Sequence, residues 1–171
     1  GGIAIIRISG KDALAIARKL FYSATWLQQL PVAQKVLLGE IRDPKTEQCV
    51  DQVLLTFFKA PKSYTAEDVI EINSHGGTWI VSRILKLVLE QGARLAEPGE
   101  FTRRAFVNGR LDLTQAEAVA DVIDSASDRA LSSAISQLKG GLSRRLNILH
   151  ENLLNVQAQL EASIDFTEDG L

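Results

Sequence analysis

The sequence predicts an α+β domain, in which a mixed β-sheet packs against helices, followed by an all-helical segment. Short runs of β-branched and apolar residues have the length and composition of strands, over residues 3–8, 36–41, 50–58 and 69–72. Apolar residues recur at helical spacing over residues 11–21 and 78–90. Near residue 113 the mixed pattern gives way to a purely helical one. We therefore expect a first domain over residues 1–113 and a second over residues 114–171.

The first strand, over residues 3–8, is apolar at nearly every position, which predicts a strand covered on both faces. Arg7 interrupts this run. A cation there either sits at a sheet edge with its guanidinium reaching water or contacts a ligand. Ser9 and Gly10 then mark the start of the helix over residues 11–21.

Residues 22–34 read as a loop, and the next two runs read as a β-hairpin with a loop of about five residues. Glu71 lies within the strand over residues 69–72. Side chains alternate along a strand, so Glu71 points away from its isoleucine neighbours, either to water or to a ligand at the end of the sheet.

A tight turn with a glycine pair, Asn73-Ser-His75-Gly-Gly77, leads into the helix over residues 78–90. His75 is expected to be a turn residue that hydrogen-bonds the backbone, with general base or ligand as the alternative. After this helix, residues 93–96 are expected to add a short strand.

Two turn dipeptides, Pro98-Gly99 and Asn108-Gly109, bracket a short helical stretch. Beyond it, Thr114 and Glu117 have the spacing of a capping box. Arg110 lies between these helix ends. That position would aim one cation into a pocket, although a solvated surface arginine fits the spacing equally well.

Apolar residues recur from 131 to 164 at a mean spacing of ~3.7 residues, which is typical of a helical stripe. The pair Gly140-Gly141 interrupts the stripe and predicts a kink or two consecutive helices. An amphipathic element of this length needs a partner to cover its apolar side.

The composition, with 46% apolar residues among 171, supports a globular core. Cys49 is the only cysteine, so no intramolecular disulfide forms, and no apolar run approaches the ~20 residues of a membrane helix. These features predict a soluble, cytoplasmic protein. A net charge of −2 argues against strong binding to a nucleic acid by this chain alone. The chain has no methionine and opens inside a strand, so we expect a longer natural protein.

Catalytic and metal signatures are weak in this sequence. Two histidines and one cysteine do not make a metal set, and no catalytic triad or carboxylate pair stands out. The phosphate-binding Gly-x-x-x-x-Gly-Lys-Ser/Thr motif does not occur. We therefore assign neither catalytic residues nor a metal site, and look for a binding site instead.

Three stretches together resemble the tRNA-modification GTPase family known as MnmE or TrmE. They are Gly1-Gly-Ile-Ala-Ile-Ile-Arg-Ile-Ser-Gly10, Ser63-Tyr-Thr-Ala-Glu-Asp-Val-Ile-Glu-Ile-Asn-Ser-His-Gly-Gly77 and the segment from Pro98 to Asp124, which begins Pro-Gly-Glu-Phe-Thr. The resemblance spans nearly the whole chain, in the family's order. It implies an aminomethyltransferase-like folate-binding and dimerisation domain, followed by the first helices of a central helical domain.

The resemblance also implies a ligand and a site. The ligand would be a reduced folate, either 5-formyl- or 5,10-methylene-tetrahydrofolate, and the family's folate contacts fall on Arg7, Glu71 and Arg110. At the last position some members have lysine, and arginine keeps the charge but changes the donor geometry. A pterin edge presents an N–H and an amino group that match the two oxygens of a carboxylate, and the anionic folate tail suits an arginine.

For the whole protein, the resemblance implies GTP hydrolysis with Mg²⁺ and K⁺ in a domain outside this chain. It implies homodimers and, with the partner MnmG (GidA), carboxymethylaminomethyl modification of the tRNA wobble uridine. The folate would supply the one-carbon unit. The alternative is a purely structural dimerisation module whose charged residues form salt bridges. A folate-dependent aminomethyltransferase in its own right is disfavoured because such enzymes are much longer.

Overall fold

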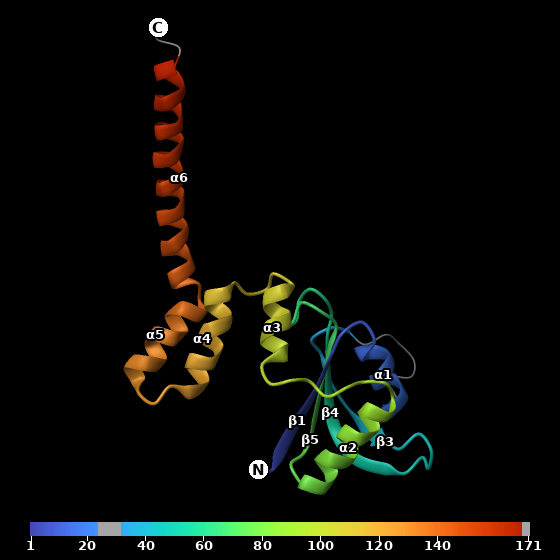
Figure 1. Ribbon diagram of the computed structural model, residues 1–171. Helices are drawn as coiled ribbons and strands as arrows, with labels where there is room; N and C mark the ends of the chain where they lie inside the picture. The colour runs from blue at the N-terminus through green and yellow to red at the C-terminus, as the bar shows by residue number, and fades with distance from the viewer. Residues whose placement is uncertain (24–31, 169–171) are drawn as a thin grey trace. The chain divides into compact units, whose positions relative to one another are not determined.

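The computed structural model describes residues 1–23 and 32–168, and most of the loop expected over residues 22–34 lies outside them. The chain forms two compact units, unit 1 from Gly1 to Arg110 and unit 2 from Leu111 to Leu171. Figure 1 shows that unit 1 holds every strand, whereas unit 2 is helical. The α+β class followed by a helical segment is thereby confirmed.

Unit 1 is built on a five-stranded sheet in the order β1-β5-β4-β3-β2. Its strands are β1 (Ile3–Ser9), β2 (Phe21–Tyr22), β3 (Val36–Arg42), β4 (Cys49–Phe58) and β5 (Val69–His75). Every pairing is antiparallel, so the expectation of a mixed sheet is wrong in this respect. The physical reason is the connections: β3, β4 and β5 follow one another through loops without a helical crossover, and parallel neighbours need such a crossover.

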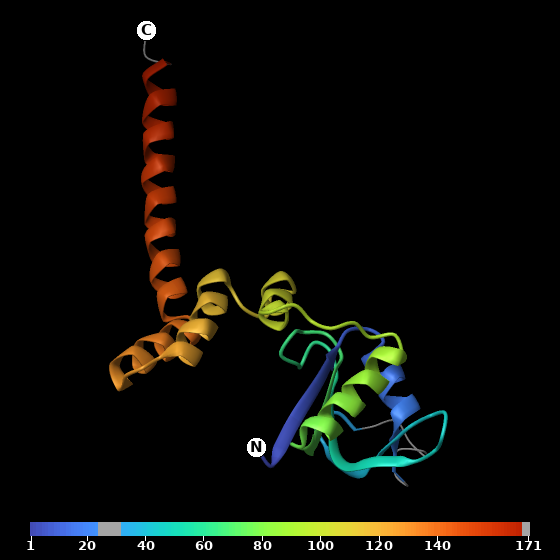
Figure 2. The same cartoon turned by 60° about the horizontal axis from the view of Figure 1, so that its bottom comes forward.

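One face of the sheet holds the core of unit 1. Helices α1 (Ala13–Leu20) and α2 (Thr78–Glu90) cover this face, as Figures 1 and 2 show. The helix expected over residues 78–90 is confirmed. The core gathers apolar side chains from both helices and from the strands, among them Ile8, Leu20, Ile41, Leu55, Ile72, Ile84 and Leu87.

The opposite face of the sheet carries exposed apolar side chains. Ile6 and Ile8 of β1 are buried, whereas Ile3 and Ile5 are 75% and 58% exposed. The expectation that this strand is covered on both faces is therefore wrong. β1 is an edge strand with one buried face. Arg7, which comes between Ile6 and Ile8 in the sequence, points to the opposite, exposed face.

The expected hairpin is confirmed as β3 and β4, which pair across the turn that begins at Asp43. The short strand expected over residues 93–96 is wrong, because this segment is irregular and pairs with no strand. The side chain of Arg94 instead binds Glu100 at the start of α3 (Glu100–Val107). The helical stretch between the two turn dipeptides is thereby confirmed.

Unit 2 consists of α4 (Leu113–Asp124), α5 (Asp128–Leu138) and α6 (Gly141–Glu168). The capping box of α4 forms between Asp112 and Gln115, so its assignment to Thr114 and Glu117 is wrong. The Asp112 carboxylate accepts a hydrogen bond from the backbone N–H of Gln115, the third residue of the helix. The Thr114 hydroxyl, in the first turn, donates a second hydrogen bond to the same carboxylate. The break expected at Gly140-Gly141 is confirmed as two consecutive helices.

Candidate functional site

Arg7 and Glu71 form a cross-strand ion pair. They lie directly opposite each other in the register of β1 and β5, which places both side chains on the exposed face. Nε and Nη2 of Arg7 lie 2.8 and 2.6 Å from Oε1 of Glu71. Among the described residues Oε2 of Glu71 accepts no hydrogen bond, so half of this carboxylate is open to a ligand.

Two aromatic rings flank the Arg7 guanidinium. Its carbon Cζ lies 5.9 Å from the ring centroid of Tyr64 and 5.6 Å from that of Phe101, within the range of cation–π attraction. The Tyr64 hydroxyl is 2.9 Å from Oγ1 of Thr102, which ties the loop before β5 to α3. The pair thus sits among flat apolar faces that suit an aromatic ligand.

Arg110 follows α3 and contacts the loop that carries Tyr64, but it does not touch the ion pair. Gly109 adopts a left-handed φ of 71°, and the Arg110 N–H then donates to the Ala105 carbonyl at 2.8 Å. The Arg110 side chain donates from Nε to the Ser63 carbonyl at 3.4 Å. No ion pair of the described residues includes Arg110, so its positive charge stays available to an anion.

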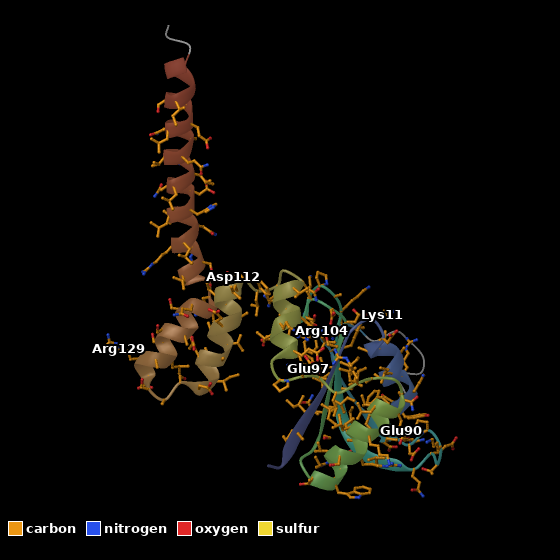
Figure 3. All side chains as sticks on the ribbon, in the orientation of Figure 1. Lys11, Glu90, Glu97, Arg104, Asp112 and Arg129 are labelled. Atoms are coloured by element: carbon orange, nitrogen blue, oxygen red, sulfur yellow. The ribbon has the colours of Figure 1, made fainter. Side chains whose placement is uncertain are left out.

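A partly buried polar network holds the loop before β5 in place. Ser9 Oγ lies 2.7 Å from Oγ1 of the fully buried Thr65 and donates to Glu67 Oε2 at 2.8 Å. Arg104 reaches back from α3 to the Ser9 carbonyl at 3.2 Å and to Glu67 at 3.3 Å (Figure 3). The network joins β1, this loop and α3, and thereby fixes where Tyr64 is presented beside Arg7.

A cavity of about 450 Å³ lies alongside β1 within unit 1. Arg7 and Phe101 line it together with Lys11, Arg104 and apolar side chains of α1 and α2. Its volume falls within the range of ~300–1,000 Å³ that is usual for small-molecule sites. Arg7, but not Glu71, therefore borders a space large enough for part of an organic ligand.

Glu100 anchors the segment before α3. It is buried, and its carboxylate accepts from Arg94 Nη1 at 2.8 Å, Arg94 Nη2 at 2.5 Å and the Glu97 N–H at 2.9 Å. The Arg94 hydrogen bond, followed by the Glu97 N–H, lowers the pKa of Glu100 from 4.5 to about 2. This carboxylate is charged at neutral pH and serves to hold α3.

Replacing Glu100 by glutamine is expected to remove an acid-sensitive part of the stability of unit 1. Because folding depresses the pKa of Glu100, its contribution is full above pH 4.5 and is lost as the pH falls towards about 2. Urea midpoints across this interval should fall steeply in the parent chain and less steeply in Glu100→Gln. Glu97→Gln, at an exposed pair with Arg103, is the control, and an equal flattening there would contradict the assignment.

His75 is held by a carboxylate, so the expectation of a backbone partner is wrong. Its Nδ1 lies 2.7 Å from Asp51 Oδ1, and its backbone N–H donates to Oδ2 of the same buried residue at 2.9 Å. Asp51 thereby fixes the end of β5. Among the described residues, no three His, Cys, Asp or Glu side chains gather as a metal site would require.

Sequence reasoning missed Tyr64, Phe101 and Thr102 as residues around the ion pair. An aromatic residue inside a hydroxyl-rich polar loop was the available signal for Tyr64.

No helix in the described part of the chain has the length and hydropathy to cross a membrane.

Comparison with known proteins divides the chain as the two units do. The family described as GTP-binding protein TrmE N-terminus matches residues 1–110, and the one described as MnmE helical domain matches residues 113–171. Proteins named tRNA modification GTPase MnmE are similar over nearly the whole chain. The protein of Moorella thermoacetica is 53% identical over 99% of it, and that of Enterococcus faecalis is 48% identical over 98%.

A third relative with the same name, from Trichormus variabilis, is 49% identical over 99% of the chain. The chain spans only 36% or 37% of the length of these three relatives. Because the TrmE N-terminal match covers all of unit 1 and the helical match nearly all of unit 2, the chain belongs to the MnmE (TrmE) family of tRNA modification GTPases.

Proposed function

We propose that unit 1 binds a reduced folate, 5-formyl- or 5,10-methylene-tetrahydrofolate, with Arg7, Glu71 and Arg110 as its charged contacts. The observation that carries the proposal is the Glu71 carboxylate: Arg7, which two aromatic rings flank, holds one of its oxygens, and the other accepts no hydrogen bond among the described residues. A pterin presents a flat ring and adjacent N–H donors, which match these features. Arg110, which forms no ion pair within the described residues, supplies a cation for the anionic tail.

In the whole protein, this site would supply the one-carbon unit for carboxymethylaminomethyl modification of the tRNA wobble uridine together with MnmG. GTP hydrolysis with Mg²⁺ and K⁺ would occur in a domain outside these residues, since the phosphate-binding loop does not occur in this sequence. The names of the relatives, which are tRNA modification GTPases, support this role.

Calorimetric titration of 5-formyltetrahydrofolate into the 171-residue chain tests the folate assignment. Saturable binding is expected, and it should weaken in Arg110→Ala more than in Arg110→Lys, which keeps the charge. A folded chain that binds neither 5-formyl- nor 5,10-methylene-tetrahydrofolate would overturn the assignment and favour the alternative, a purely structural dimerisation module.

We further propose that two copies of unit 1 associate through the exposed face of the sheet. Five large apolar side chains lie on this face at 44–75% exposure, namely Ile3, Ile5, Val36, Leu38 and Leu54. They come from β1, β3 and β4. Leu38 and Leu54 are direct cross-strand partners, and Asn73 of β5 lies between Leu54 and Ile5 in the same row. Several exposed apolar side chains on one face of a sheet are typical of an interaction surface.

Placing a charge on this face of the sheet is expected to abolish the dimer. Leu38→Glu would bury an unpaired carboxylate between the two copies, so sedimentation velocity should show monomers at concentrations where the parent chain is dimeric. Trp79→Glu is the matched control, because Trp79 is 73% exposed on α2 and lies outside the patch. Dimers that survive Leu38→Glu but dissociate with Trp79→Glu would place the interface on the helical side.

A further inference from the structure

A second cluster of cations lies in unit 2, far along the chain from the proposed folate site. All Lys and Arg residues after Arg110 fall between residues 129 and 145, and no Asp or Glu occurs between Asp128 and Glu151. Unit 2 is acidic as a whole, so its positive charge is concentrated at one place. A low net charge therefore does not exclude a local site for anions.

Three of these four cations line an open groove between α5 and the start of α6. The groove has a volume of about 880 Å³ and is lined by Arg129, Ser132, Ser133 and Ser136 of α5 and by Arg144 and Arg145 of α6. Figure 3 shows Arg129 extending outward from α5. The serines repeat at helical spacing, so their hydroxyls share one side of α5 with Arg129.

The donors in this groove have few partners within the protein. No ion pair among the described residues includes Arg129, Arg144 or Arg145. Arg144 donates from Nη1 to the Lys139 carbonyl at 3.0 Å, which orients that side chain across the junction of the two helices. Among the described contacts the three serine hydroxyls make no hydrogen bond, so they remain free to donate to a ligand.

The start of α6 adds further donors. Gly141 lines the groove and is the first residue of this 28-residue helix, and the first turn of any helix leaves N–H groups without intrahelical partners. The positive end of the helix dipole adds to the arginine charges. Guanidinium, hydroxyl and N–H groups together donate to oxygen anions, and phosphate is the anion that such sets recognise most often.

We propose that the groove formed by Arg129, Arg144, Arg145 and the α5 serines binds the phosphodiester backbone of RNA. The groove is open and the cations lie on two helices, so it suits successive phosphates of a polymer more than one enclosed small anion. The choice of RNA rests on the proposed role in tRNA modification. Backbone contacts carry no sequence information, so this groove positions RNA and does not select a nucleotide.

Binding of a fluorescent, unmodified tRNA transcript to the 171-residue chain tests the proposal. In Arg129→Gln/Arg145→Gln we expect the dissociation constant to rise about tenfold at about 0.1 M salt. The slope of log K against log salt should flatten by about two, because two phosphate contacts are lost. Arg18→Gln/Lys19→Gln removes the same charge from exposed positions of α1 and should leave both quantities nearly unchanged.

Equal weakening in both double variants, or none in the groove variant, would overturn the proposal. Poly-glutamate and unlabelled RNA can be compared as competitors at equal concentrations of negative charge. If poly-glutamate displaces the labelled transcript as well as unlabelled RNA does, the groove would bind an acidic protein instead. Folate titration of the same proteins separates the two proposals. If the chain binds RNA but not folate, the proposal for the groove stands and the folate proposal fails. If the chain binds folate but not RNA, the proposal for the groove fails and the folate proposal stands.

Discussion

Replacing Glu71 by glutamine is expected to lower the affinity of the chain for 5-formyltetrahydrofolate by about 100-fold. Arg7 occupies Oε1 of Glu71 and leaves Oε2 open, which can accept up to two hydrogen bonds from the ligand through its two lone pairs. Each charged hydrogen bond contributes about 1.5–3 kcal/mol, and tenfold in affinity corresponds to about 1.4 kcal/mol. Glutamine keeps one acceptor but turns an amide N–H₂ towards a ligand donor. It also leaves Arg7 without its anionic partner.

The same substitution should barely change folding. Arg7 and Glu71 have side chains that are 38% and 21% exposed, and ion pairs this accessible contribute about 0–1 kcal/mol to stability. Urea denaturation should therefore give nearly equal midpoints for Glu71→Gln and the parent chain. This separation between binding and stability distinguishes a ligand contact from a structural salt bridge.

Glu40→Gln is the matched control for this titration. Glu40 pairs with Arg42 on β3 at 2.9 Å with similar exposure, and one aromatic ring, that of Tyr22, flanks Arg42, whereas two rings flank Arg7. It should leave folate affinity unchanged. If Glu40→Gln weakens binding as much as Glu71→Gln does, the loss reflects general electrostatics of the sheet. If neither has an effect, the Arg7–Glu71 pair is a structural ion pair only.

The sequence predicted those parts of the fold that depend on local signals. The helix over residues 78–90 and the β3–β4 hairpin have clear periodicity between turn residues, and their bounds lie close to the expected ones. The break at Gly140-Gly141 could also be predicted from the sequence, because adjacent glycines disfavour a continuous helix. In these segments local preference and tertiary structure agree.

Exposure of the apolar sheet face could not be read from the sequence. Ile3 and Ile5 look like core residues in the sequence. The residue type alone does not show whether helices of the same chain, another molecule or water cover an apolar side chain. The start of α4 presented a different ambiguity. Asp112 with Gln115 and Thr114 with Glu117 both have capping spacing, and only the geometry shows that the earlier pair forms the cap.

Part of the candidate site could be predicted from the sequence. Charges inside apolar strands pointed to Arg7 and Glu71, but their pairing follows from the register of β1 and β5, which lie far apart along the chain. Tyr64 and Phe101 reach Arg7 from the loop before β5 and from α3. Such contacts depend on how distant segments fold together, and no local pattern contains that information.

Truncating Ile72 to alanine should destabilise unit 1 by about 2–5 kcal/mol, because a fully buried side chain leaves both lost contacts and a cavity. Ile72 lies on β5 against α1 and α2, at the centre of the core face. Trp79 lies on α2 of unit 1, so its fluorescence during urea denaturation reports on this unit. The midpoint should fall while the slope stays constant.

Ile3→Ala tests the opposite face of the same sheet. Ile3 is 75% exposed, so in a monomer its truncation should cost less than about 0.5 kcal/mol. If a second copy covers this face, the cost of Ile3→Ala rises with protein concentration, because association stabilises the folded state by mass action. The cost of Ile72→Ala would stay the same at every concentration. Equal, concentration-independent losses in both variants would mean that both faces of β1 and β5 are buried within one chain, as the apolar pattern of the strand alone predicted.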